Sequence, residues 1–383
     1  MLRTRGWLLL VALPASLPGH SSKPAALQVP AEFAPLDSII VARMGESHAP
    51  GLAIGIVRGK RVVFTRGYGV RRLGAPDPVT TQSLFHMASL TKPFVATAIM
   101  QLVERRRVAL DTPVTRYLPY FRVKGDGARI TVRQLLTHTA GMPDVTDYGW
   151  DHPEYDAAAL ERYVRGLADS TLIWAPGTRY RYSNIGFEVL ADVVAKVARM
   201  PFEEYVRRQI LQPLGMRSST LVKPQADTTL LTTPHTTDST GAANVSPVFP
   251  YNRPHAGSST LLSSVDDMNR WMLANLARGR LDGRRVLDTA SYQELWRPAT
   301  VTDITSKTID RGHIGLSWFM GTYSGRRLIV HSGADVGFLS FIALAPDDSV
   351  GVIVMMNSEH GTVLSAVVQA ALTAALRTIR APR

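Results

Sequence analysis

The sequence contains no cysteine among its 383 residues, which excludes disulfide bonds, thiol nucleophiles and thiolate metal sites. Lysine is also scarce, because only seven of the 43 basic residues are lysines. The formal net charge is +12, but the basic residues are scattered and lack the pattern of a nucleic-acid-binding surface. We therefore expect no nucleic-acid partner and only a weak attraction to anionic surfaces such as the cell envelope.

Beyond the N-terminus, the sequence lacks any apolar run long enough to span a bilayer. Residues 1–19 combine Arg3 and Arg5 with a short apolar run, followed by prolines and small residues. This pattern is typical of a secretory signal peptide. We expect residues 1–25 to be a signal peptide and linker, and the protein to be exported, periplasmic or secreted, with no stable membrane span. A disordered tail or a wrongly assigned start codon is the alternative.

The periodicity of apolar residues predicts helices and strands over most of residues 26–383. The predicted strands form two groups, at residues 52–57 and 62–68 and at residues 314–322, 327–331, 339–345 and 351–356. The predicted helices are residues 36–44, 89–107, 132–136, 157–167, 185–198, 202–210, 265–276 and 363–378. Short turns between consecutive strands imply antiparallel pairing.

These elements predict a two-lobed α+β fold. One antiparallel β-sheet is flanked by the N- and C-terminal helices, and a large all-helical lobe is inserted between its two groups of strands. We assign residues 31–85 and 300–383 to the sheet lobe and residues 86–299 to the helical lobe of one catalytic domain. Residues 223–259 are rich in Thr, Pro, Ser and Asn, which predicts a long loop. We expect that loop to line a cleft between the lobes.

Ser89 and Lys92 form the only Ser-x-x-Lys pattern in the chain, at the start of a predicted helix. Residues three positions apart lie on one face of a helix. A neighbouring amine is one of the groups that activate a serine hydroxyl as a nucleophile, and the N–H groups of a helix start favour developing negative charge. Ser89 is therefore a candidate nucleophile, although a helix cap followed by a solvated lysine would show the same pattern.

Tyr182 and Asn184 form the only Tyr-x-Asn pattern, just before the predicted helix at residues 185–198. Nearby cations can lower the pKa of a phenol, which is ~10 in model peptides, so that the phenol transfers protons. Asn184 has an amide group that can donate to a substrate carbonyl. Taken alone, Tyr182 fits better as a half-buried aromatic side chain at the edge of a domain.

His331, Ser332, Gly333 and Ala334 follow the predicted strand at residues 327–331. Small residues at the end of a strand let a substrate backbone approach closely, and they can offer a backbone N–H group to an oxyanion. Taken alone, His331 fits a histidine at the end of a strand better than a catalytic group.

Taken together, Ser-x-x-Lys, Tyr-Ser-Asn and His-Ser-Gly, in this order, resemble the three motifs of penicillin-recognising serine hydrolases. The resemblance is to the branch of the serine β-lactamase-like and penicillin-binding proteins that holds class C β-lactamases, serine DD-peptidases, D-peptidases and β-lactamase-like carboxylesterases. It covers most of the chain and includes the stretches at residues 130–141, 213–216 and 333–338.

The resemblance implies that Ser89 is acylated and that Lys92 and Tyr182 share the proton transfers, with either of them as the base. It implies that Asn184, His331, Ser332, Gly333 and Ala334 bind the substrate, with the N–H groups of Ser89 and Ala334 as the oxyanion hole. No metal or organic cofactor is expected. The expected partner is a small-molecule or peptide substrate with an amide or ester bond.

His331 stands where many β-lactamases of this group carry lysine. Because histidine has an unperturbed pKa of ~6.5, we expect the binding of a substrate carboxylate to be weaker and pH-dependent. The histidine form resembles DD-peptidases and D-peptidases more closely, which favours a D-amino-acid peptide carboxypeptidase or a carboxylesterase. A class C-like β-lactamase is one alternative. A non-catalytic penicillin-binding sensor or scaffold is another.

Overall fold

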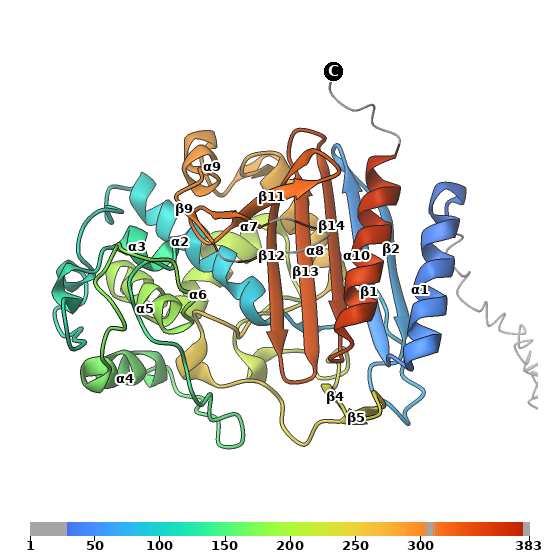
Figure 1. Ribbon diagram of the computed structural model, residues 1–383, viewed down its shortest axis with the longest axis horizontal. Coiled ribbons are helices and arrows are strands. Elements are labelled where there is room, and N and C mark those ends of the chain that lie inside the picture. Colours follow the sequence, from blue (N-terminus) through green and yellow to red (C-terminus); the bar gives the residue numbers. More distant parts are fainter. Residues whose placement is uncertain (1–28, 303, 305–308, 310, 378–383) are drawn as a thin grey trace, which may run out of the picture.

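The computed structural model describes residues 29–302, 304, 309 and 311–377, and Figure 1 shows their arrangement. The predicted signal peptide and linker at residues 1–25 lie outside the described residues. Among the helices that are described, none has the length and apolar character needed to cross a membrane.

An eight-stranded sheet forms the centre of the fold, in the order β2-β1-β14-β13-β12-β11-β10-β9, and all neighbouring strands are antiparallel. Its strands are β1 (Gly51–Arg58), β2 (Arg61–Gly69), β9 (Thr300–Val301), β10 (His313–Ile314), β11 (Phe319–Tyr323), β12 (Arg326–Asp335), β13 (Phe338–Ala345) and β14 (Val350–Met356). β1 pairs with β14, from Leu52 opposite Met356 to Arg58 opposite Val350. This pairing joins the two ends of the chain in one sheet.

Helices cover both faces of the sheet. α1 (Ala34–Ser47) and α10 (Gly361–Leu376) lie side by side on one face (Figure 1), while α8 (Val265–Leu276) packs against β1 and β14 on the other. The side chains of β1 alternate between the two faces, so Ile54 and Ile56 join the core under α1 and α10, whereas Ala53 and Val57 join the core under α8. β1 is apolar from Gly51 to Val57, where both of its faces are buried, and it ends at the charged Arg58.

Most of the remaining helices lie beyond the side of the sheet that ends in β9, whereas α7 (Gln212–Leu214) lies near α8 behind the sheet (Figure 1). The others are α2 (Lys92–Glu104), α3 (Val132–Leu136), α4 (Ala159–Gly166), α5 (Ile185–Ala198), α6 (Phe202–Val206) and α9 (Thr289–Leu295). α5 is the central helix of this group, because it packs against α2, α3, α4 and α6. Short two-stranded pairs lie outside the main sheet: β3 (Phe85–His86) with β6 (Leu262–Ser263), β4 (His235–Thr237) with β5 (Ala243–Val245), and β7 (Arg280–Leu281) with β8 (Arg284–Arg285).

The predicted α+β fold, with an antiparallel sheet and flanking terminal helices, is confirmed. Three predicted helices match α3, α5 and α8 at both ends, and the side chain of Ser264 caps α8 by accepting from the N–H of Asp267. The single strand predicted at residues 314–322 is instead split into β10 and β11. The break comes at Ser317, whose φ of 73° is left-handed and ends an extended run.

Candidate active site

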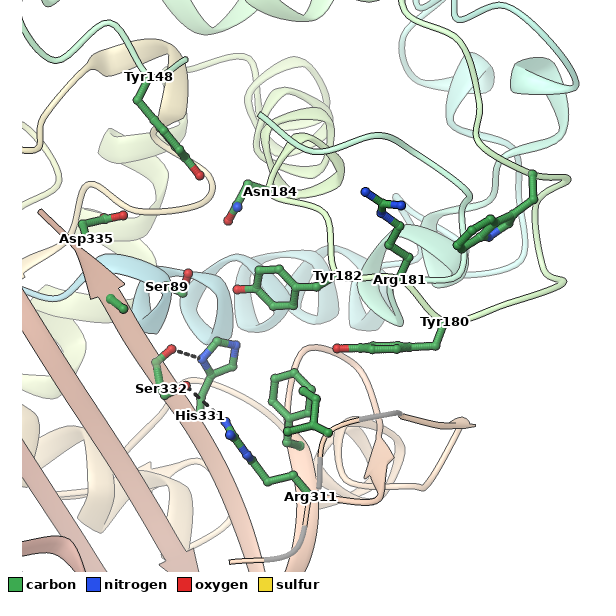
Figure 2. A pocket seen from close by; sticks show the side chains of 14 residues that line it. Ser89, Tyr148, Tyr180, Arg181, Tyr182, Asn184, Arg311, His331, Ser332 and Asp335 are labelled. Atoms are coloured by element: carbon green, nitrogen blue, oxygen red, sulfur yellow. Dashed lines mark hydrogen bonds between the residues drawn. The ribbon is translucent and has the colours of Figure 1, made fainter. Parts of the chain in front are cut away.

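A cleft of about 600 Å³ lies where the start of α2, the loop before α5 and the end of β12 meet. Six of the residues expected from the sequence line it: Ser89, Tyr182, Asn184, His331, Ser332 and Ala334. Figure 2 shows Tyr182, Asn184, His331 and Ser332 grouped around Ser89. The structure therefore brings together three sequence patterns that are far apart in the chain.

Ser89 lies on a tight turn and not within α2. A 3₁₀ turn spans Ala88–Thr91 and α2 begins at Lys92. Ala88 has a left-handed φ of 49°, which costs a residue with a Cβ roughly 1–2 kcal/mol. The sheet and the turn itself hold this conformation, since the Ser340 hydroxyl donates to the Met87 carbonyl (2.9 Å) and the Thr91 hydroxyl donates to the Ala88 carbonyl (2.8 Å). Ser89 is thus presented to the cleft on a strained but well-supported backbone.

The Lys92 side chain is fully buried and lies within hydrogen-bond distance of three oxygens. Its Nζ is 2.9 Å from Ser89 Oγ, 2.6 Å from Asn184 Oδ1 and 3.0 Å from the Ser258 carbonyl oxygen. Burial lowers the pKa of Lys92 from 10.5 to about 8, against the opposing charges of Glu188, Asp335 and Asp144. A substantial fraction of the amine is therefore neutral at mildly alkaline pH.

The geometry also fixes how a neutral Lys92 amine points. The Asn184 amide oxygen and the Ser258 carbonyl oxygen can only accept, so they take the two N–H groups of the neutral amine. The nitrogen lone pair is then left for Ser89 Oγ–H. This arrangement suits Lys92 as the group that removes the proton from Ser89.

Asn184 is held by Asp144 on the side away from Lys92. The Asn184 Nδ2 group donates to both Asp144 oxygens, at 3.0 and 3.3 Å, and the Asn184 backbone N–H donates to Asp144 Oδ1 at 2.8 Å. Because Lys92 offers donors and Asp144 offers acceptors, only one orientation of the Asn184 amide satisfies both neighbours. Asn184 lines the cleft with its amide oxygen directed at Lys92 and its Nδ2 group directed at Asp144.

Tyr182 interacts with Ser89 through its phenol and lies with its ring centroid 5.0 Å from Lys92 Nζ. The expectation that neighbouring cations lower its pKa is wrong. Burial raises the pKa of the Tyr182 phenol well above its usual range, and the hydrogen bond with Ser89 only partly opposes this rise. His138 stacks on the Tyr182 ring at 4.2 Å, which positions that ring. Tyr182 therefore remains a neutral phenol that can relay a proton.

His331 lines the same cleft as Ser89 and Tyr182, and its ring is buried. Its Nδ1–H group donates to the Ser332 carbonyl oxygen at 2.8 Å, and among the described residues no partner faces its Nε2 atom. Burial and the charge of Lys92 lower the pKa of His331 to about 3. The expectation that His331 titrates near neutral pH is therefore wrong, because a ring with so low a pKa is uncharged at neutral pH.

Gly333 faces the turn that carries Ser89 and not the cleft. A Cβ atom at this position would lie 2.2 Å from the Met87 carbonyl oxygen and 2.4 Å from Ser340 Oγ. Gly333 therefore allows β12 to approach the turn closely. The expectation that it admits a substrate backbone is not met, whereas Ser332 and Ala334, on the alternate positions of β12, do line the cleft.

Several site residues were missed from the sequence: Asp144, Arg311, Asp335 and the Ser258 carbonyl. Asp335 lies within the stretch at residues 333–338 that carried the family resemblance, and Asp144 lies just after the stretch at residues 130–141. Their position in or next to these stretches was the one sequence signal that pointed to them. We expected residues 223–259 to line the cleft. This expectation is wrong, because none of the described residues that line the cleft belongs to that segment. That segment instead supplies the Ser258 carbonyl behind Lys92.

Residues 36–375 match the sequence model of the family described as Beta-lactamase. Among curated proteins, Protein flp of Staphylococcus aureus (strain MW2) is 26% identical over 333 residues, which is 85% of this chain and 63% of that protein. The unguisins hydrolase ungD' of Aspergillus campestris is 29% identical over 82% of this chain and 60% of its own length. The chain thus spans less than two thirds of the curated relatives it matches.

Solved structures show the same fold. The octameric penicillin-binding protein homologue from Pyrococcus abyssi superposes with a TM-score of 0.79 at 27% identity, covering 90% of this chain and 77% of that one. The D-amino acid amidase from Ochrobactrum anthropi SV3, complexed with L-phenylalanine amide, superposes with a TM-score of 0.74 at 20% identity. This second match covers 91% of this chain and 100% of the amidase chain.

The packing of Gly333 on the Ser89 turn predicts a large effect of adding one methyl group. Gly333→Ala should lower the free energy of unfolding by about 1–3 kcal/mol, because the added Cβ overlaps backbone and hydroxyl oxygens. Chemical denaturation measures the change. Gly45→Ala is the matched control, since nothing lies within 4 Å of a Cβ there and α1 should become slightly more stable. Equal stabilities of the two variants would contradict this account of Gly333.

Proposed function

Since the chain belongs to the beta-lactamase family, we propose that it is a serine hydrolase that forms an acyl-enzyme on Ser89 and cleaves amide or ester bonds. The family consists mostly of serine hydrolases, such as amidases and penicillin-binding proteins. The observation that carries the proposal is the buried Lys92 amine, 2.9 Å from Ser89 Oγ and with a pKa of about 8.

In the acylation step, the neutral Lys92 amine takes the proton of Ser89 Oγ as the oxygen attacks the substrate carbonyl carbon. The carbonyl oxygen becomes an oxyanion, for which the backbone N–H groups of Ser89 and Ala334 are the proposed donors. Each such donor is typically worth about 3 kcal/mol of barrier. The tetrahedral intermediate then breaks its bond to the leaving group.

The leaving nitrogen or oxygen must receive a proton as it departs. Tyr182 is suited to this task because its phenol contacts Ser89 and stays protonated. The phenol gives its proton to the leaving group, and the nearby Lys92 ammonium then returns a proton to the phenol. Water then attacks the ester on Ser89, with the same two groups removing its proton. The acid product leaves, Ser89 is regenerated, and one water has been consumed for each bond cleaved.

We propose D-amino-acid peptides, amides and small esters as the substrate class. The D-amino acid amidase supports amide cleavage, and the unguisins hydrolase supports a hydrolytic reaction. The neutral His331 removes one fixed cation expected of a β-lactamase carboxylate site. A class C-like β-lactamase remains the nearest alternative, and rapid turnover of penicillin would favour it. A stable penicillin adduct would favour the peptidase or esterase.

The first prediction is a covalent adduct on Ser89. Intact-mass analysis after exposure to a penicillin and, separately, to p-nitrophenyl acetate should show an acylated protein or turnover for the wild type. Ser89→Ala should show no adduct, and its esterase rate should fall at least about 10³-fold. The control is Ser38→Ala, which removes an exposed hydroxyl on α1. Equal activity of wild type and Ser89→Ala would overturn the proposal.

The second prediction concerns pH. If neutral Lys92 is the base, kcat/KM for p-nitrophenyl acetate should rise with pH and then reach a plateau. The midpoint of this rising limb of the pH profile should lie near the Lys92 pKa of about 8. Lys92→Arg keeps a permanent cation, so it should lose activity over the whole range. Lys196→Arg, on an exposed lysine that pairs with Glu161, is the control and should leave the profile unchanged. A flat profile for the wild type would exclude Lys92 as the base.

The third prediction tests the positioning role of Asp144. Asp144→Asn removes a carboxylate that raises the Lys92 pKa and places an amide group against Asn184. We expect kcat to fall about 10- to 100-fold and the limb of the pH profile to move to lower pH. Asp147→Asn is the control, because its carboxylate accepts only from the Gly149 N–H in the described contacts. A loss of activity with an unmoved limb would indicate a merely structural role.

A further inference from the structure

Asp335 is a charged residue of the cleft that the proposed reaction does not use. Side chains alternate along β12, so His331, Gly333 and Asp335 face the same side. Gly333 packs on the turn that carries Ser89. Asp335 therefore lies one strand repeat beyond Gly333, about 7 Å along β12, and His331 lies the same distance from Gly333 in the opposite direction.

The Asp335 carboxylate is held in place from one side. Its Oδ2 atom accepts from His86 Nε2 at 2.7 Å, and its side chain is 9% exposed. His86 Nδ1 is buried and has no hydrogen-bond partner in the described structure, which fits the tautomer with its hydrogen on Nε2. The rings of Phe249 and Phe338 pack on His86 and fix its position. One carboxylate oxygen is thus anchored, and the other is not taken by any described hydrogen bond.

His86 is the group that pairs with the Asp335 carboxylate, and its ring carries a positive charge only when it is protonated. Within the described residues, neither lysine nor arginine forms an ion pair with it. Lys92 is already surrounded by its three oxygens, and Figure 2 shows Arg181 and Arg311 on the far side of Ser89 from Asp335. The cleft therefore has an acidic end at Asp335 and a basic end at these two arginines. A mostly buried carboxylate without a cation is costly unless a ligand supplies one.

The proton relay decides which part of a substrate meets the acidic end. The leaving group must sit beside Tyr182, which protonates it, and Figure 2 shows Tyr182 and Asp335 on opposite sides of Ser89. The acyl group therefore extends toward Asp335. In an aminoacyl substrate the α-nitrogen is two bonds from the carbonyl carbon, about 2.5 Å, and one more hydrogen bond of about 2.8 Å spans most of the distance to Asp335.

We propose that Asp335 binds the free ammonium group of the acyl donor, so that the site prefers aminoacyl amides, peptides and esters with an unblocked amino group. This inference rests on the proposed acyl-enzyme function and adds the substrate class of the same site. A blocked, N-acylated substrate would place a neutral amide against the carboxylate and would gain no ion pair.

The test compares D-phenylalanine p-nitroanilide with its N-acetyl derivative. The wild type should cleave D-phenylalanine p-nitroanilide with a kcat/KM at least about tenfold higher than that for the N-acetyl derivative. The difference should lie in KM and not in kcat. In Asp335→Asn, whose amide oxygen can still accept from His86, this preference should fall to about one. Asp347→Asn removes an exposed carboxylate elsewhere on the sheet lobe and should keep the preference of the wild type. A preference that survives in Asp335→Asn would overturn the ammonium site.

Two further measurements keep the outcome clear. If Asp335→Asn does not fold, competitive inhibition of the wild type by D-phenylalaninol and by N-acetyl-D-phenylalaninol replaces it, and equal inhibition by both would contradict the proposal. Hydrolysis of p-nitrophenyl acetate, which has no amino group, tests Ser89 chemistry separately. Hydrolysis of that ester with no preference between the two anilides would refute the ammonium site alone, whereas no reaction with the ester would refute the proposed function itself.

Discussion

The buried amine of Lys92 needs hydrogen-bond partners for its N–H groups, and it finds them on segments that are far apart in the chain. Ser89 lies one turn before it, Asn184 precedes α5, and the Ser258 carbonyl comes from the segment that leads to β6. Because an unpartnered amine in the interior would be strongly unfavourable, these segments are held in one arrangement. The same burial lowers the Lys92 pKa to about 8, so the interaction that organises the site also prepares its base.

The sheet supplies the second constraint on the site. β12 packs on the Ser89 turn through Gly333, and Ser340 of β13 bonds to the Met87 carbonyl. β12 and β13, two interior strands of the sheet, therefore support the left-handed backbone of Ala88 and place the alternating side chains of β12 beside the turn that carries Ser89. This alignment places neutral His331 on one side of the nucleophile and charged Asp335 on the other. The cleft is therefore negatively charged at only one of its two ends along β12.

Much of the fold could be predicted from local patterns. The helices at residues 132–136, 185–198 and 265–276 match because their periodicity and caps are properties of neighbouring residues. The 3₁₀ turn at Ala88–Thr91 and the break at Ser317 could not be predicted in this way. The first is held by the Ser340 hydroxyl, and the second by backbone bonds such as that from Ser317 N–H to the Leu136 carbonyl, so both depend on contacts distant in sequence.

The sequence by itself identified the reactive pair of the site, Ser89 and Lys92. These two residues are one helical turn apart, so they can be recognised as a pair without tertiary information. It also determined the antiparallel sheet, through short turns between apolar strands. Only the tertiary structure decided the charge states. Lys92 becomes easier to deprotonate, Tyr182 stays protonated and His331 stays neutral because each is buried. The tertiary structure also decided the roles of Asp144, Ser258 and Asp335, since burial and long-range contacts arise only when distant segments pack together.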